Sequence, residues 1–209
     1  MPCFRGPPSP TKCPPTSWPK MLQDFLVSKG LTGINLDTTS FVAACSELTH
    51  DPENVEASLS DADKKKRIAQ IDDEHRNRRY LLRLFESLFK EDGPHVYVSD
   101  VVMEEVSTIF RSFAGPRERD RATILFSRVK NSKESLREYD VCDVSHHLLG
   151  QRSKHMKPRH QRIFMDGIQR RLLTLTADKA FVSACRHRGF DLVVEGWVLE
   201  HSPRSLTGL

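Results

Sequence analysis

Three apolar runs, each leading into an acid and then into a helical pattern, constrain the fold of this chain more than any other feature. The runs span residues 31–36, 96–98 and 172–176. Asp37 follows the first run directly, Asp178 lies two residues past the third, and Glu105 lies in the first turn of the helix expected after the second. Because strands that alternate with helices through short connections form parallel βαβ units, we predict a three-layer α/β/α sandwich with a mainly parallel central sheet. The carboxyl ends of such strands meet at one edge of the sheet, where ligand sites of α/β proteins form.

Helical spacing and capping signals place the other elements. Helices are expected at 21–29, 38–48, 61–90, 101–113, 118–129, 159–171 and 178–188, partly helical structure at 132–150, a fourth strand at 191–194 and a loop at 50–60. We assign one domain to residues 21–200, with a long helical excursion at 61–91 and a C-terminal tail at 201–209. Residues 1–20 hold seven of the twelve prolines and no acid, which predicts a disordered Pro-rich tail.

Composition argues against several classes of protein. No apolar run approaches the length of a membrane span, and the net charge of +4 is weakly basic. The five cysteines form no Cys-x-x-Cys pair, which favours reduced thiols in an intracellular protein, cytoplasmic or nuclear. Cys45 and Cys185 share apolar helix faces with Phe41 and Phe181, so we expect them in the core. The prolines of residues 1–20 argue against organelle targeting.

Acids gathered from separate strands suit one kind of chemistry. Mg²⁺ and Mn²⁺ prefer oxygen ligands, so carboxylates at neighbouring strand ends favour a site for either ion. Such an ion lowers the pKa of a bound water and neutralises a scissile phosphate. The alternative is structural: Asp37 and Asp178 each precede a helix and can cap it, which stabilises by ~1 kcal/mol apiece.

The order and context of these segments resemble the PIN-domain nuclease family. Residues 36–41 are similar to its opening Asp-Thr motif, residues 99–106 to its second motif, and residues 173–181, followed by 188–194, to its closing Thr-x-Asp motif. The resemblance covers residues 31–195. It implies a metal-dependent endoribonuclease that cleaves RNA, with single-stranded RNA favoured, and that holds Mg²⁺ or Mn²⁺ through Asp37, Glu105 and Asp178.

One position departs from the family pattern. The family usually carries another acid on the helix before the closing strand, which corresponds to positions 158–162 here, and none of these is acidic. A helix shortened by about one turn would bring Asp166 to the same face, so we expect Asp166 as the fourth catalytic and metal-binding acid. Asp140 and Asp143 are the substitutes if residues 150–158 form an insertion. Without a fourth acid, the chain would be a catalytically inactive PIN-like module that binds RNA or protein.

Basic residues concentrate just before the closing strand. Residues 151–171 contain seven Lys and Arg against the single acid Asp166, a balance that predicts salt-dependent binding to RNA phosphates. The predicted RNA-binding residues are Arg152, Lys154, Lys157, Arg159, Arg162, Arg170 and Arg171. The apolar half of the 61–91 excursion, or the Pro-rich tail, would serve a protein partner.

Overall fold

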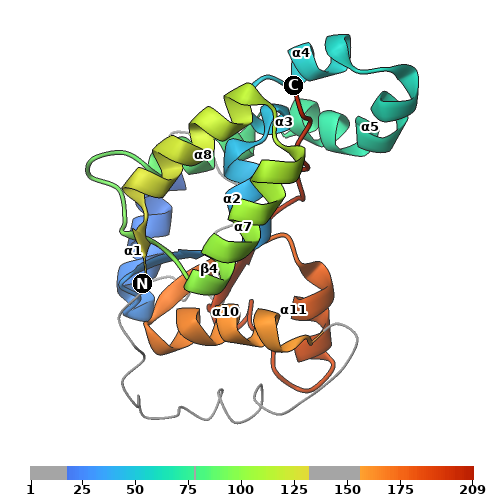
Figure 1. The fold of residues 1–209 in the computed structure, drawn as a ribbon. Coiled ribbons are helices and arrows are strands. Elements are labelled where there is room, and N and C mark those ends of the chain that lie inside the picture. The colour runs from blue at the N-terminus through green and yellow to red at the C-terminus, as the bar shows by residue number, and fades with distance from the viewer. Residues whose placement is uncertain (1–17, 78, 132–155) are drawn as a thin grey trace.

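A fully parallel β-sheet forms the centre of the fold. The computed structural model describes residues 18–77, 79–131 and 156–209 (Figure 1). Its five strands lie in the order β3-β2-β1-β4-β5. They are β1 (Gly33–Leu36), β2 (Val96–Val98), β3 (Lys130–Asn131), β4 (Leu172–Thr176) and β5 (Val198–Glu200). Helices cover the sheet, which confirms the predicted α/β/α sandwich.

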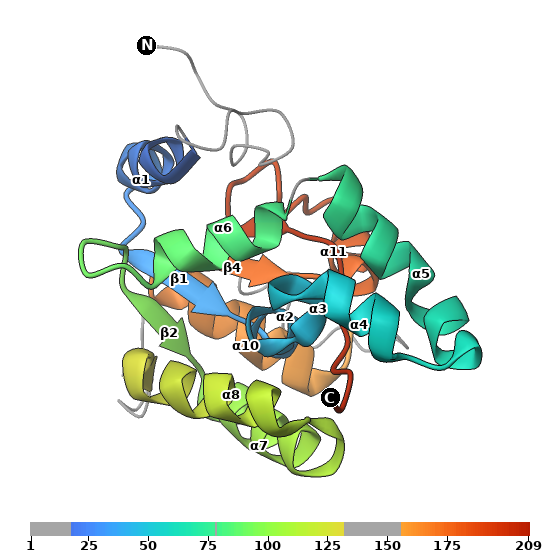
Figure 2. The same cartoon turned by 90° about the horizontal axis from the view of Figure 1, so that it is seen from above.

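The structure describes ten helices, several of which cover the two faces of the sheet. They are α1 (Trp18–Lys29), α2 (Thr38–Cys45), α3 (Glu47–His50), α4 (Pro52–Ser58), α5 (Asp61–Arg76), α6 (Tyr80–Leu88), α7 (Asp100–Phe113), α8 (Pro116–Arg128), α10 (Pro158–Gln169) and α11 (Lys179–Arg186). Figure 2 shows α1 and α6 on one side of the sheet and α7, α8 and α10 on the other. None of the helices in the described part of the chain is long and apolar enough to cross a membrane.

The two central strands, β1 and β4, lie within the core. Every residue of β1 and β4 is buried, as expected for parallel strands that carry helices on both faces. Helix α10 approaches these strands closely at Gly167, where a Cβ atom would lie 2.4 Å from the Thr174 hydroxyl. The predicted core residues Cys45 and Cys185 are both buried. The sheet and α10 therefore form one rigid base for the loops at the strand ends.

Several predicted elements differ in the structure. The helix expected at 61–90 is divided into α5 and α6, because Arg79 adopts a left-handed backbone with φ 57°. The strand expected at 191–194 is a turn, in which Asp191 accepts hydrogen bonds from the N–H groups of Val193 and Val194, and the fifth strand comes later, at Val198–Glu200. The loop expected at 50–60 contains α4. In the last two cases, side-chain hydrogen bonds of Asp191 and of Asp51, the N-cap of α4, to backbone N–H groups outweigh the hydrophobic pattern.

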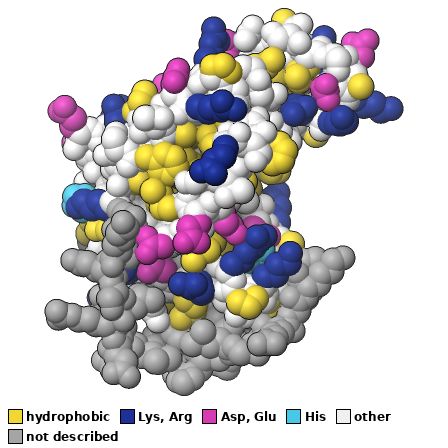
Figure 3. All heavy atoms as spheres, viewed as in Figure 1, with side chains coloured by type: hydrophobic (Ala, Val, Ile, Leu, Met, Phe, Trp, Pro, Cys, Tyr) yellow, Lys and Arg dark blue, Asp and Glu magenta, His cyan; other side chains and the backbone are white. Residues whose placement is uncertain are grey.

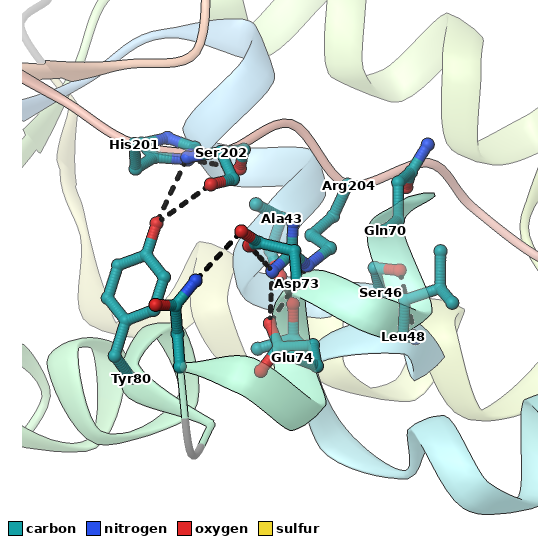
Figure 4. Close-up of polar contacts among 12 residues, drawn as sticks. Ala43, Ser46, Leu48, Gln70, Asp73, Glu74, Tyr80, His201, Ser202 and Arg204 are labelled. Carbon is teal, nitrogen blue, oxygen red and sulfur yellow. Dashed lines mark hydrogen bonds and ion pairs between the residues drawn. The ribbon is translucent and has the colours of Figure 1, made fainter. Parts of the chain in front are cut away.

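The C-terminal segment 201–209 extends the domain rather than standing apart as the expected tail. Figure 4 shows Arg204 directed at α5, where its guanidinium lies 2.7 Å from carboxylate oxygens of both Asp73 and Glu74. The side chains of Arg204 and Glu74 are fully buried. Glu118 of α8 holds the end of the segment by accepting hydrogen bonds from the backbone N–H groups of Thr207 and Gly208.

Replacing Arg204 by Ala should lower the free energy of unfolding by about 3–5 kcal/mol, because Glu74 would stay buried without its charged partner. Replacing both Glu74 and Arg204 by Met should recover most of this loss, since no buried charge then remains at that point. Urea unfolding followed by circular dichroism measures both effects. Arg186→Ala removes an exposed ion pair with Asp191 and serves as the matched control. An Arg204→Ala loss no larger than that of the control would contradict the role of the buried pair.

Candidate functional site

A cavity of about 590 Å³ lies at the carboxyl ends of the strands, and three of the four predicted acids line it. Asp37 comes from the junction of β1 and α2, Glu105 from α7, and Asp178 from the junction of β4 and α11. Parallel pairing of β1 with both β2 and β4 brings these junctions to the same edge of the sheet. The meeting of the three acids follows directly from the topology.

Asp37 is the most enclosed of these acids. Its carboxylate is 4% exposed and accepts hydrogen bonds from the Ser40 N–H at 2.7 Å, from the Thr39 hydroxyl at 2.8 Å and from the Thr176 hydroxyl of β4. Burial raises the pKa of Asp37 above its ordinary value, and these hydrogen bonds oppose the rise. The bond to Ser40 also caps α2, so the predicted capping role is present in addition to the position in the cavity.

Glu105 lies opposite a positive charge. Its Oε1 atom lies 2.9 Å from a guanidinium nitrogen of Arg159, and its Oε2 atom accepts a hydrogen bond of 2.5 Å from the Thr38 hydroxyl. The Arg159 side chain is 51% exposed, while that of Glu105 is 22% exposed. The acid of α7 is therefore already joined to a cation at the start of α10.

Asp178 has the same kind of neighbour. Its Oδ2 atom lies 3.1 Å from Nδ1 of His160, a contact at ion-pair distance without the alignment of a hydrogen bond. Its Oδ1 atom accepts a hydrogen bond from the Phe181 N–H and thereby caps α11. Burial alone would raise the pKa of Asp178, but His160 and the capping N–H group together lower it below its ordinary value.

The side-chain types at this site favour a divalent metal ion, whereas their present arrangement does not. Three carboxylates are the oxygen ligands that Mg²⁺ and Mn²⁺ prefer. Within 18–77, 79–131 and 156–209, however, no three His, Cys, Asp or Glu side chains are grouped closely enough to hold an ion. An ion would have to replace Arg159 and His160 as the partners of Glu105 and Asp178.

The expected position of Asp166 in this site is wrong. Asp166 does not line the cavity; it is 6% exposed and forms an ion pair of 2.8 Å with Arg170, one turn further along α10. It lies six residues past His160, so about 9 Å of helix rise separates the two. His160 itself occupies the stretch 158–162 where the resemblance places the fourth acid. The substitutes Asp140 and Asp143 lie outside the described residues.

The predicted basic block is only partly within the described chain. Arg152 and Lys154 lie outside it. Of the other five residues, only Arg159 lines the cavity, while Lys157, Arg162 and Arg171 are exposed and Arg170 pairs with Asp166. The RNA-binding role of the block therefore stays a prediction.

Hydroxyl groups around the acids are the part of the site that sequence reasoning missed. Thr38, Thr39 and Thr176 all donate to a cavity carboxylate. The residue pattern offered a signal, because each of these threonines stands within two residues of an acid identified as a site residue. Nothing in the pattern indicated that His160 would face Asp178.

A buried pair behind the cavity links it to the C-terminal segment. His201 Nε2 lies 2.7 Å from the Ser40 hydroxyl, and its Nδ1 lies 2.8 Å from the Ser202 carbonyl oxygen. Burial lowers the pKa of His201 to about 4. The imidazole is therefore neutral in the folded protein over most of the pH range.

Comparison with known proteins gives one family match. A family model described as "Protein of unknown function (DUF1308)" matches residues 34–208. The matched span contains Asp37, Glu105 and Asp178 and most of the C-terminal segment. No solved structure matches the chain.

Lowering the pH through the window from 6.5 to about 4 should destabilise the fold through His201. In this window the unfolded chain binds a proton at this residue and the folded protein does not, so stability falls as the pH falls. His201→Gln should remove up to about 3 kcal/mol of this pH dependence. Urea unfolding at a series of pH values measures it, with exposed His187→Gln as the control. An unchanged pH dependence in His201→Gln would contradict the buried neutral state.

Proposed function

This chain belongs to the DUF1308 family, and we propose that it is a metal-dependent endoribonuclease of PIN-like architecture. The observation that carries the proposal is that Asp37, Glu105 and Asp178, from three separate segments of the chain, line one cavity. N-terminal caps alone need no common cavity, whereas a site for phosphodiester cleavage does. The order of the three segments along the chain is also that of the PIN-domain motifs.

The carboxylates of Asp37, Glu105 and Asp178 would hold Mg²⁺ or Mn²⁺. When bound there, such an ion supplies a water of lowered pKa and neutralises charge on the phosphate. The protein's own contribution is to hold Asp37 rigidly through Thr39, Ser40 and Thr176, so that one ligand is in place in advance.

Arg159 has a second role in this proposal. Its guanidinium can bind a phosphate oxygen through two parallel hydrogen bonds, a geometry that lysine lacks. Its exposure of 51% allows the side chain to exchange Glu105 for a phosphate with little change in packing. The start of α10 would then grip the RNA backbone beside the acids.

The cavity favours an unpaired nucleotide over a duplex. A volume of about 590 Å³ falls within the range of small-ligand sites, which is too small to admit a double helix. Apolar side chains of Ile109 and Phe164 line it together with the acids, and they suit the face of a base. We therefore assign single-stranded RNA as the substrate class.

A second candidate function is favoured by the charges on α10. Arg159 and His160 already contact Glu105 and Asp178, and His160 stands where the family resemblance expects an acid. In that case Glu105 and Asp178 have protein partners without an ion, and the protein is a non-catalytic PIN-like module that binds RNA or a protein. Its acids then serve as helix caps and ion-pair partners.

Asp178→Asn should lower Mn²⁺-dependent cleavage of single-stranded RNA by at least about 100-fold, because even residues that only orient metal ligands cost about 10–100-fold. The amide can still cap α11, so the fold should be unchanged by circular dichroism. Release of product from a 5′-labelled oligonucleotide, with Mn²⁺, Mg²⁺ or EDTA, measures the rate.

Asp166→Asn is the matched control, because it makes the same change outside the cavity on the neighbouring helix. It should cleave at close to the parental rate. Equal cleavage by Asp178→Asn and the parent would remove Asp178 from the mechanism. Metal-independent product in all three preparations would indicate a contaminating ribonuclease and exclude cleavage by this cavity.

A further inference from the structure

A second groove of about 350 Å³ runs between α7 and α8. Phe110, Arg111 and Thr123 contribute to its lining, together with Arg119 and Phe126. In Figure 3 apolar side chains gather over α7 and α8, with Lys or Arg side chains among them. The groove has no acid in its lining, in contrast to the cavity on the other side of α7.

The two arginines of this groove have no partner in the described part of the chain. Arg111 and Arg119 are exposed, and neither guanidinium forms an ion pair or a hydrogen bond with a described residue. By contrast, Arg121 on the same helix α8 forms an ion pair of 2.8 Å with Glu47. Two unpaired guanidinium groups in an acid-free groove favour an anion, and a phosphate suits their fork geometry.

Aromatic rings line the groove together with these positive charges. Phe126 is half-buried, with its ring centroid 4.8 Å from that of Phe41, so it is held rigidly while part of it stays accessible. Phe110 also lines the groove and is 5% exposed. Proteins that bind single-stranded nucleic acid combine a basic groove with aromatic side chains on which bases stack.

Helix α7 joins this groove to the acid cavity. Thr108 and Ile109 line the cavity, while Phe110 and Arg111, the next residues along the chain, line the groove. An RNA strand that leaves the cavity therefore has to cross only α7 to reach Arg111. Continuity with the cavity favours RNA over an acidic peptide, which the charges and apolar surface alone would also suit.

We propose that the groove between α7 and α8 is a second subsite for single-stranded RNA, which binds the nucleotide next to the one in the cavity. Arg111 and Arg119 bind its phosphates, and the base lies against Phe126. The subsite rests on the proposed function, because the cavity defines where the RNA strand begins. It lies outside the basic block at 151–171, so it adds contacts that the block does not supply.

The test is binding of a short fluorescent oligouridine in EDTA, measured by fluorescence anisotropy over a range of salt concentrations. Arg111→Ala/Arg119→Ala should flatten the log-log salt slope by about 1.4, since each phosphate contact contributes about 0.7 on single strands. The matched control is Arg117→Ala/Arg128→Ala, which removes two charges from α8 outside the groove and should leave the slope nearly parental. Thr123→Glu, an exposed change that places a negative charge in the groove, should weaken binding as well.

A parental slope in Arg111→Ala/Arg119→Ala would overturn the subsite. Binding of an acidic, aromatic peptide that depends on both arginines, with no RNA binding, would also overturn it and assign the groove to a protein partner. Because EDTA prevents metal-dependent cleavage, the result is independent of catalysis. A flattened salt slope in Arg111→Ala/Arg119→Ala, together with no cleavage by the parent protein, would support the subsite and reject only the nuclease function. Cleavage by the parent protein, together with an unchanged salt slope in the variant, would support the nuclease function and reject the subsite.

Discussion

The hydrogen bonds that enclose the Asp37 carboxylate are the interaction on which the rest of the site depends. A buried charge is costly unless it is paired or hydrogen-bonded, and here the donors come from two different segments. Thr39 and Ser40 belong to the first turn of α2, and Thr176 belongs to the end of β4. Asp37 thus ties the strand ends of β1 and β4 together, and the other two acids take their positions relative to this point.

Charge balance decides what the cavity can do. Two acids of the cavity, Glu105 and Asp178, face Arg159 and His160 of α10, so a divalent ion that binds both carboxylates has to displace these two contacts. Arg159 is exposed and long, so water and phosphate can compensate for its loss of Glu105. His160 is more confined, since its ring lies edge-on to Phe181 with centroids 6.1 Å apart. The start of α10 therefore controls whether the carboxylates of Glu105 and Asp178 are available to an ion.

The sequence predicts the three central strands, β2, β1 and β4, and the three acids that follow them, for a physical reason. Strand runs and their following acids are local patterns, and parallel pairing then brings every strand end to the same edge. Asp166 could not be placed in this way, because spacing along a helix does not show that Arg170 lies one turn away to neutralise it. His160 was not predicted as a cavity residue, because a histidine within a basic stretch of sequence is usually interpreted as a surface residue.

The C-terminal segment shows a second limit of pattern reading. Charged residues such as Arg204 and Glu74 indicate surface in any hydrophobicity pattern, yet here they form a buried pair that fixes the segment on α5. The left-handed backbone of Arg79, which divides the expected long helix, could not be predicted from the sequence either, because arginine has no preference for that conformation. A long-range polar partner decides the first feature and the backbone conformation of one residue the second, and neither follows from apolar periodicity.

The most direct test of the account is Mn²⁺ binding measured by isothermal titration calorimetry on three proteins: the parent, Arg159→Ala and Glu105→Gln/Asp178→Asn. If the cavity holds an ion in competition with α10, the parent binds Mn²⁺, Arg159→Ala binds it more tightly, and the double variant loses binding. If no protein binds Mn²⁺, or if all three bind it equally, the carboxylates of this cavity are not metal ligands and the central claim is contradicted.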